Sequence, residues 1–378
     1  MRKLVIIPDS FKGTLSSERV CEIVGGCARR VFPGCEVVNI PVADGGEGSV
    51  DAFLAAMGGE RVTVTVTGPW SEPCEGFYAL VDGGRTAIVE MAAAAGLPMV
   101  GERRDPSRTT TYGVGELILD AARRGAKRIV VGLGGSATND GGCGAACAVG
   151  VKFYDAAGAS FVPVGGTLKD VARIDASGLD AALDGVEISA MCDIDNPLCG
   201  EHGAAHVFGP QKGADAAMVD MLDRGLRHLA EVMRRDLGAD ISDVPGSGAA
   251  GGMGAGMAAF FGAALRPGID TVLDTVGFDA ALDGADMVIT GEGKLDSQSL
   301  GGKVVIGVAR AAAKHGVPVT AIVGGADYGA EAAWAEGVTA VFPISRLPQD
   351  FELLKPHSEE NLAFTAENVL RLVKSAGM

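Results

Sequence analysis

Residues 129–142, IVVGLGGSATNDGG, decide how the rest of the chain is interpreted. A short apolar run typical of a buried strand passes into a glycine-rich turn and then into an alanine-rich segment, which favours a strand, loop and helix in succession. Glycine lets the backbone approach a ligand closely, and the free N–H groups at the start of a helix attract anions. The stretch therefore predicts a phosphate or carboxylate site, and its candidate residues are Gly134, Gly135, Ser136, Thr138 and Asn139.

Two other interpretations of this stretch stay open on its residues alone. A strand-to-helix turn uses the same glycines for packing. The spacing Gly132-x-Gly134-x-x-Ala137 also matches the loose dinucleotide fingerprint of dehydrogenases. The dehydrogenase hypothesis is weakened because no convincing acidic residue at the end of a second strand follows at the expected interval of about 20 residues.

Composition bounds the class of protein. The chain has 378 residues, 57 of them glycine, with 47% hydrophobic and only 5% aromatic residues, which is typical of helices packed closely on sheets. Its net charge of −16 argues against nucleic acid or an anionic membrane as partner. The eight cysteines include no C-x-x-C pair, and the first residues predict a strand rather than a signal peptide. We therefore expect a cytoplasmic enzyme with reduced thiols.

Strand and helix patterns alternate at both ends of the chain and change in between. Apolar runs at 4–8 and 36–42 each lead into a polar, glycine-containing loop and then a helical period. From residue 61 the pattern alternates as in antiparallel strands. We expect an α/β protein with a discontinuous doubly wound, Rossmann-like domain and an inserted mixed α/β domain. The expected boundaries are 1–60 with 286–378 for the first domain and 61–285 for the second.

Four further loops at predicted strand ends mix glycine with charged or amide side chains. They contain Asp9, Ser10 and Lys12; Asp44, Gly45, Gly46 and Glu47; Asp193, Asp195 and Asn196; and Gly291, Glu292, Gly293, Lys294 and Asp296. Each loop by itself has a structural explanation as a capped turn, an Asx turn or an exposed turn. Carboxylates and amides in such loops also suit Mg²⁺, and lysines suit phosphate oxygens.

Together, the five loops match what phosphoryl transfer requires: amides and lysines for triphosphate charge, carboxylates for Mg²⁺, and an aspartate for the acceptor hydroxyl. No Walker A motif is present, because neither Gly293-Lys294 nor Gly302-Lys303 is followed by serine or threonine. The protein-kinase motifs are absent as well. A hypothesis from a different class is a non-catalytic sensor that binds an organic acid between two domains.

The chain closely resembles the bacterial class I glycerate kinases over nearly its whole length. The matching stretches are PDSFKGTLSS, PVADGGEGS, GLGGSATNDGG, CDIDNPLCG with FGPQKGA, PGSGAAGGMGAG and ITGEGKLDSQSLGGK. The resemblance implies phosphorylation of D-glycerate with ATP and Mg²⁺, usually to 2-phosphoglycerate. It also implies a two-domain α/β fold with the active site in the cleft between the domains. Phosphorylation at the 3-hydroxyl stays open, because sequence does not show how the substrate is placed.

Chemistry, rather than the resemblance, suggests a role for each candidate residue. The predicted catalytic residues are Asp44, Asp193, Lys12 and Lys294, with one aspartate as general base. Substrate binding is assigned to Asp9, Ser10, Gly45, Gly46, Glu47 and Asn196, and Mg²⁺ to Asp193 and Asp296. ATP phosphates are expected at Gly134, Gly135, Ser136, Thr138 and Asn139 or at Gly291, Glu292 and Gly293. The expected partners are D-glycerate and at most a second copy of the chain in a homodimer.

Overall fold

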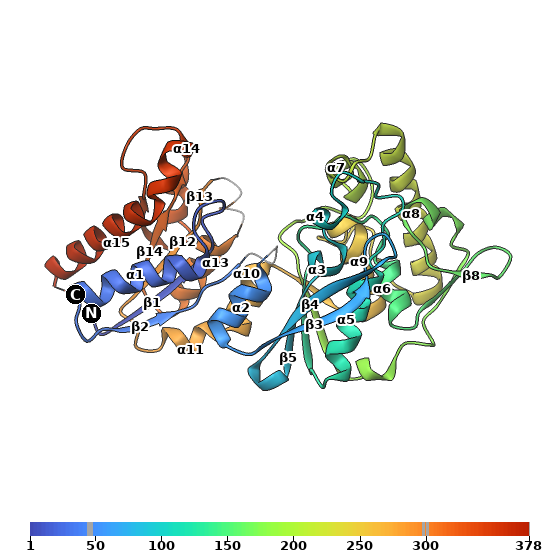
Figure 1. Ribbon diagram of the computed structural model, residues 1–378, viewed down its shortest axis with the longest axis horizontal. Helices are drawn as coiled ribbons and strands as arrows, with labels where there is room; N and C mark the ends of the chain where they lie inside the picture. Colours follow the sequence, from blue (N-terminus) through green and yellow to red (C-terminus); the bar gives the residue numbers. More distant parts are fainter. Residues whose placement is uncertain (44–47, 297–298, 300–301, 378) are drawn as a thin grey trace. The chain divides into compact units, whose positions relative to one another are not determined.

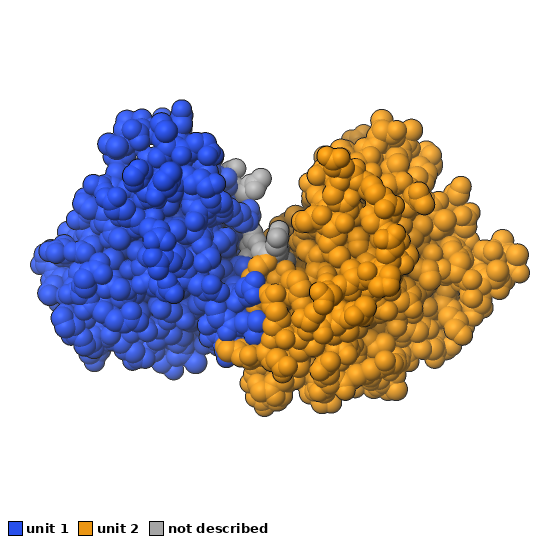
Figure 2. Space-filling model, viewed as in Figure 1, with its two compact units in different colours: residues 1–44, 51–57, 269–378 blue, residues 45–50, 58–268 orange. Residues whose placement is uncertain are grey.

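The computed structural model describes residues 1–43, 48–296, 299 and 302–377. Two compact units divide the chain (Figure 2). Unit 1 comprises Met1–Asp44, Asp51–Met57 and Ile269–Met378, and unit 2 comprises Gly45–Val50 and Gly58–Gly268. The mixed α/β architecture with several sheets confirms the expected fold class.

Unit 1 is built on a five-stranded parallel sheet (Figure 1). Its strands are β1 (Lys3–Pro8), β2 (Glu36–Asn39), β12 (Met287–Gly291), β14 (Val319–Val323) and β16 (Val338–Pro343). Their spatial order is β16-β14-β12-β1-β2. The next strand of the chain, β2, pairs with one side of β1, whereas β12, β14 and β16 extend the sheet from its other side. This is the doubly wound order, with a topological switch point between β1 and β12.

Helices cover both faces of this sheet because its strand residues alternate between them. Leu4 and Ile6 pack with α1 (Ser17–Val31) and α15 (Ser358–Ser375), which lie side by side on one face (Figure 1). Helix α13 (Val304–Lys314) also packs against the strands of this sheet, among them β12 and β14. The N-terminus of α1 is capped by Ser16, whose Oγ accepts a hydrogen bond of 3.2 Å from the amide of Arg19. Further elements here are α2 (Ser49–Met57), β13 (Lys294–Leu295), β15 (Gly325–Ala326) and α14 (Phe351–Leu354).

Residues 269–285 cluster with unit 1, although the sequence pattern assigned them to the inserted domain. They form most of α10 (Gly268–Thr275) and all of α11 (Phe278–Leu282). Their position has a packing reason, because α11 contacts α13 and a Cβ added to Gly307 of α13 would lie 2.5 Å from the side chain of Ile269. The boundary between the two units therefore lies between Gly268 and Ile269, the first two residues of α10, rather than just before β12.

Unit 2 contains a six-stranded mixed sheet in the order β11-β10-β6-β5-β4-β3. Its strands are β3 (Glu60–Thr67), β4 (Pro73–Val81), β5 (Thr86–Glu90), β6 (Arg128–Gly132), β10 (Glu187–Met191) and β11 (Ala264–Arg266). The predicted antiparallel alternation from residue 61 is present, since β3 pairs with β4 and β4 with β5 in antiparallel register. The strands from β5 to β11 are parallel, so their carboxyl ends share one edge of the sheet.

Small residues let the helices of unit 2 pack closely. Its helices are α3 (Ala92–Ala95), α4 (Leu97–Val100), α5 (Tyr112–Arg123), α6 (Cys143–Ala148), α7 (Ala204–Phe208), α8 (Ala216–Leu237) and α9 (Ala249–Phe261). A Cβ on Gly115 of α5 would lie 2.2 Å from the carbonyl oxygen of Ala145 in α6, so only glycine permits this approach. A separate small sheet joins β7 (Lys152–Tyr154), β8 (Ser160–Phe161) and β9 (Arg173–Asp175). Among the described helices of the whole chain, none has the length and apolarity needed to cross a membrane.

Candidate active site

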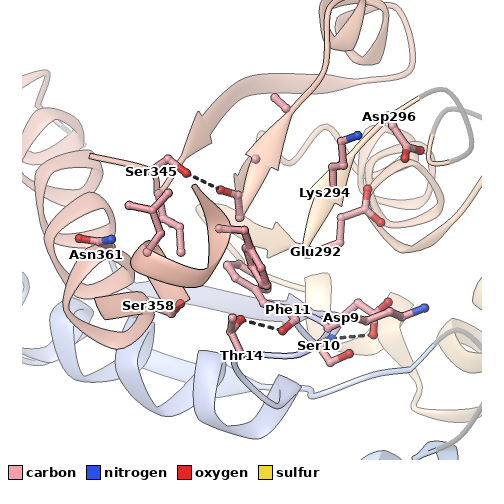
Figure 3. A pocket seen from close by; sticks show the side chains of 18 of the residues that line it. Asp9, Ser10, Phe11, Thr14, Glu292, Lys294, Asp296, Ser345, Ser358 and Asn361 are labelled. Atoms are coloured by element: carbon pink, nitrogen blue, oxygen red, sulfur yellow. Dashed lines mark hydrogen bonds between the residues drawn. The ribbon is translucent and has the colours of Figure 1, made fainter. Parts of the chain in front are cut away.

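A pocket of about 540 Å³ lies in unit 1, at the carboxyl ends of its parallel strands. Loops after β1, β12, β14 and β16 line it together with α14 and α15 (Figure 3). Open α/β sheets bind ligands at this edge, next to the switch point, because loops from neighbouring strands diverge there. The candidate residues in it are Asp9, Ser10, Lys12, Glu292, Gly293, Lys294 and Asp296.

Two carboxyl groups are buried at the switch point itself. Asp9 follows β1 and Glu292 follows β12, and each residue is only 5% exposed. The adjacent strands hold them together, since the amide of Asp9 donates a hydrogen bond of 2.8 Å to the carbonyl oxygen of Gly291. Their proximity needs the parallel pairing of β1 with β12, two segments from opposite ends of the chain.

Glu292 has a strongly raised pKa. Burial raises its pKa to about 7, and the nearby charge of Asp9 acts in the same direction, while a hydrogen bond with the Ser299 hydroxyl partly opposes them. Its Oε1 atom is buried and has no hydrogen-bond partner in the described part of the chain. A carboxylate oxygen in this state can accept a proton or a hard cation with little rearrangement.

Three lysines line the same pocket: Lys12, Lys294 and Lys303. The Nζ atom of Lys294 lies 2.8 Å from a carboxylate oxygen of Asp327, and this ion pair raises the pKa of Lys294. Both side chains are more than half exposed. Solvent screens an exposed ion pair, so Lys294 can exchange Asp327 for a phosphate at small cost.

Asp296 occupies a tight turn beside these groups. Its Oδ1 atom accepts a hydrogen bond of 3.2 Å from the amide of Ser299, and its own amide donates one of 3.2 Å to the Ser299 hydroxyl. Within the residues that the structure describes, no group of three His, Cys, Asp or Glu side chains is arranged to hold a metal ion. Any metal at Asp296 would therefore need further oxygen ligands, such as those of a bound phosphate or water.

The glycine loop after β6 belongs to unit 2. Ser136, Thr138 and Asn139 are all buried, and Thr138 Oγ1 and both polar side-chain atoms of Asn139 have no hydrogen-bond partner among the described residues. Gly135 has a φ of 74°, a backbone conformation that favours glycine. Gly135 is exposed to solvent, and Gly134 beside it is partly exposed. The stretch forms the expected strand, loop and helix, in which α6 follows Gly142.

Asp140, which follows this loop, acts as a structural anchor. Its fully buried carboxylate accepts hydrogen bonds from the amide and hydroxyl of Thr111, at 2.7 and 2.9 Å, and from the amides of Gly142 and Gly144. Burial raises the pKa of Asp140, and these four hydrogen bonds oppose the shift. The carboxylate joins the loop to the start of α5 and of α6.

Lys212 also holds the loop after β6 by hydrogen bonds. This lysine was not among the residues assigned to the site from the sequence. Its Nζ atom donates hydrogen bonds of 2.8 Å to Ser136 Oγ and 2.7 Å to the carbonyl oxygen of Thr138. The side chain is buried, and burial lowers its pKa to about 7. The sequence predicted no role for this lysine, because nothing in FGPQKGA distinguishes a buried lysine from a solvated one.

The backbone of residues 248–252 explains why glycines occur in the stretch PGSGAAGGMGAG. Ala250, Gly251 and Gly252 all have positive φ, and a Cβ on Gly251 would lie 2.0 Å from the carbonyl oxygen of Thr138. The amide of Gly141 donates a hydrogen bond of 3.1 Å to Gly251. The glycines after Ser247 therefore let the backbone press against the loop that follows β6.

Asp193 and Asn196 follow β10 in unit 2 and have different partners. Asp193 Oδ1 accepts a hydrogen bond of 2.7 Å from the amide of Gly268, the first residue of α10. The side-chain Nδ2 of Asn196 donates a hydrogen bond of 2.8 Å to the carbonyl oxygen of His202. Asp193 and Asp195 are exposed. The two units thus contain separate groups of candidate residues. The predicted residues Asp44, Gly45, Gly46 and Glu47 lie outside the residues that the structure describes.

Comparisons with known proteins agree over almost the full chain. The family model described as "Glycerate kinase family" matches residues 4–374. A glycerate kinase of Bacillus subtilis is 44% identical over 375 residues, covering 99% of this chain and 98% of that protein. The glycerate 2-kinase of Escherichia coli is 47% identical over 343 residues, or 90% of each chain. The crystal structure of a putative glycerate kinase 2 from Salmonella typhimurium superposes with a TM-score of 0.90 at 44% identity, covering 99% of both chains.

Proposed function

We propose that this chain, which belongs to the glycerate kinase family and is a kinase of glycerate, transfers the γ-phosphoryl group of ATP to the 2-hydroxyl of D-glycerate with the help of Mg²⁺. The product would be 2-phosphoglycerate. The regiospecificity is supported by the name of the Escherichia coli relative, a glycerate 2-kinase. All eight cysteines are unpaired, which supports the cytoplasm as the compartment.

The observation that carries the ATP assignment is the pocket at the switch point of unit 1. It combines two buried carboxyl groups, Asp9 and Glu292, with the lysines Lys12, Lys294 and Lys303. Polyphosphate and its counterion require this combination of cations and oxygen ligands. The lysines share this pocket with the carboxyl groups of Asp9, Glu292, Asp296 and Asp327, so Mg²⁺ would supply part of the positive charge that a triphosphate needs.

The oxygen donors of this pocket fit Mg²⁺, because Glu292 has an unpartnered buried carboxylate oxygen and the charge of Asp296 also acts on Glu292. Glu292 and Asp296 would hold the ion in unit 1, and Asp193 stays the proposed ligand in unit 2. Bound with ATP, Mg²⁺ would neutralise part of the phosphate charge. The described residues supply the remaining functions: binding, orientation and proton transfer.

The proposed reaction is a single displacement. The 2-hydroxyl oxygen of glycerate forms a bond with the γ-phosphorus, the bond from that phosphorus to the β–γ bridging oxygen breaks, and ADP leaves with the electron pair. The hydroxyl proton goes to a carboxylate, for which Asp44 and Asp193 are the proposed acceptors. Lys12 would bind the carboxylate of glycerate, and Lys294 would stabilise the charge that develops on the leaving oxygen.

Product analysis tests this function. The protein is incubated with D-glycerate, ATP and MgCl₂, ADP release is followed in a coupled assay, and the product is compared by ³¹P NMR with 2- and 3-phosphoglycerate. We expect 2-phosphoglycerate in amounts equal to ADP, and arrest of the reaction by EDTA that added Mg²⁺ reverses. A signal of 3-phosphoglycerate would overturn the regiospecificity. Tight glycerate binding without ADP release would instead indicate a sensor.

A further inference from the structure

The side chains that line the pocket of unit 1 change from charged to apolar along the sheet. Its charged part lies after β1 and β12, around Glu292 and Lys294. Its other part lies beside the edge strand β16 and is lined by the apolar side chains of Ile344, Phe351 and Leu354. Figure 3 shows Phe11 between the two parts, with Lys294 and Asp296 on one side and Ser358 and Asn361 on the other.

A largely buried polar side chain at the apolar end is available to a ligand. Asn361, on the first turn of α15, lines the pocket, is only 6% exposed, and has no hydrogen-bond partner for its side-chain amide among the described residues. Its neighbour Ser358 already donates to the carbonyl oxygen of Lys355 at 2.9 Å. The side-chain amide of Asn361 is therefore available to donate and accept hydrogen bonds with a ligand in this pocket.

These features match the two halves of a purine nucleotide. A planar base needs apolar and aromatic walls with a few polar groups for orientation, and the phosphates need cations. The volume of about 540 Å³ lies within the range of roughly 300–1,000 Å³ that is typical of small-molecule sites. The order of the strands therefore places an apolar end and a charged, lysine-containing end in one pocket.

We propose that Ile344, Phe351, Leu354 and Asn361 form the nucleoside site for the phosphoryl donor, and that the amide of Asn361 selects adenine. An asparagine amide can accept from the exocyclic amino group of adenine and donate to the adjacent ring nitrogen. The corresponding edge of guanine presents two acceptors, one of which would face the amide oxygen. This inference rests on the proposed function, because it assumes a nucleoside triphosphate as donor.

The substitution Asn361→Leu tests the inference, since leucine keeps the size of the side chain and removes both polar groups. We expect KM for ATP to rise about tenfold, in line with the loss of one bidentate contact. The ratio of kcat/KM for ATP to that for GTP should fall by a similar factor, while kcat and KM for D-glycerate stay within about twofold. Asn368→Leu is the matched control, because this exposed amide on the same helix bonds only to its own helix, at Phe364.

A second variant guards against a folding defect at the buried position. Phe351 lines the pocket but is 55% exposed, so Phe351→Ala should fold and should also raise KM for ATP. Unchanged KM for ATP and unchanged nucleotide preference in both variants would overturn the nucleoside site. A wild-type protein that turns over no nucleoside triphosphate would instead contradict the proposed function, so the two failures are distinguishable.

Discussion

At the scale of single residues, Glu292 shows how position changes the chemistry of an ordinary side chain. A glutamate after a strand is usually solvated and ionised at neutral pH. Here burial and the neighbouring Asp9 raise its pKa to about 7. The ionised form that would bind Mg²⁺ is therefore favoured only above about pH 7, while the protonated form is favoured below it.

The substitution Glu292→Gln should have opposite effects on activity and stability. In the wild type we expect kcat/KM to fall about tenfold per pH unit below pH 7, whereas the variant should lose about 100-fold at pH 8 and lack this acid limb. The folded-state pKa lies above the ordinary value of 4.5, so the folded state binds more protons and stability decreases as the pH rises from about 4.5 to 7. The neutral variant should thus be more stable at pH 8.

Initial rates between pH 5.5 and 9 and urea denaturation at pH 8 measure these two effects. Glu352→Gln is the control, because this glutamate of α14 is exposed and does not line the pocket. An acid limb that persists in Glu292→Gln would show that another group controls the pH profile.

At the scale of elements, the loop after β6 is held by two buried charged residues on different segments. Asp140 joins it to α5 and α6, and Lys212 reaches it from the turn after α7. The hydrogen bond from Lys212 makes Ser136 Oγ an acceptor, so the hydroxyl proton of Ser136 is directed elsewhere. Loop geometry at this point therefore depends on a lysine 76 positions away in the chain.

Replacing Lys212 with methionine should change how stability depends on pH. The folded state lowers the pKa of Lys212 from 10.5 to about 7, so between these values the unfolded state binds more protons and wild-type stability rises with pH. This lysine can contribute up to about 1.4 kcal/mol per pH unit to that slope. Lys212→Met should lose the contribution and, by leaving Ser136 and Thr138 without their donor, should also lower kcat.

The measurement is urea denaturation at pH 7, 8 and 9 for the wild type, Lys212→Met and the exposed control Lys169→Met. The difference in slope between the wild type and Lys212→Met isolates the buried lysine from the other titrating groups. Equal slopes in all three proteins would contradict a neutral lysine at high pH.

At the scale of the whole molecule, each unit has its own core and its own group of candidate residues. Unit 1 buries the face shared by β1, α1 and α15, while unit 2 has separate clusters around its sheet and around α8. The glycine loop that most resembled a nucleotide site belongs to unit 2, and the pocket with lysines and buried carboxyl groups belongs to unit 1. The two sites for ATP weighed from the sequence can therefore be distinguished by unit.

Hydrogen exchange should show which unit binds the nucleotide. With a nonhydrolysable ATP analogue and Mg²⁺, we expect slower amide exchange at residues 9–14, 324–327 and 344–361 of unit 1, because these segments line the pocket. D-Glycerate without nucleotide provides the reference for substrate effects. Slower exchange confined to residues 133–140 on adding the analogue would assign the triphosphate to the glycine loop instead.

Local patterns in the sequence were enough to predict several elements and the family. The strand, loop and helix over 129–142, the strands at 4–8 and 36–42 and the alternation from residue 61 are visible because side-chain periodicity and glycine placement depend on near neighbours. The acidic and basic loops at strand ends were visible for the same reason. The family resemblance arises from several such short stretches and is confirmed by the match over residues 4–374.

Tertiary structure alone decided which of these residues meet. Asp9 lies beside Glu292 because β1 pairs with β12, and pairing between the two ends of the chain depends on which faces are buried together. Burial also separated residues of the same type: Lys212 is enclosed while Lys294 is exposed, and Asn361 faces a pocket while Asn368 bonds to its own helix. Sequence supplies the chemical groups, but their pKa values and partners follow from desolvation and contact, which only the packed fold determines.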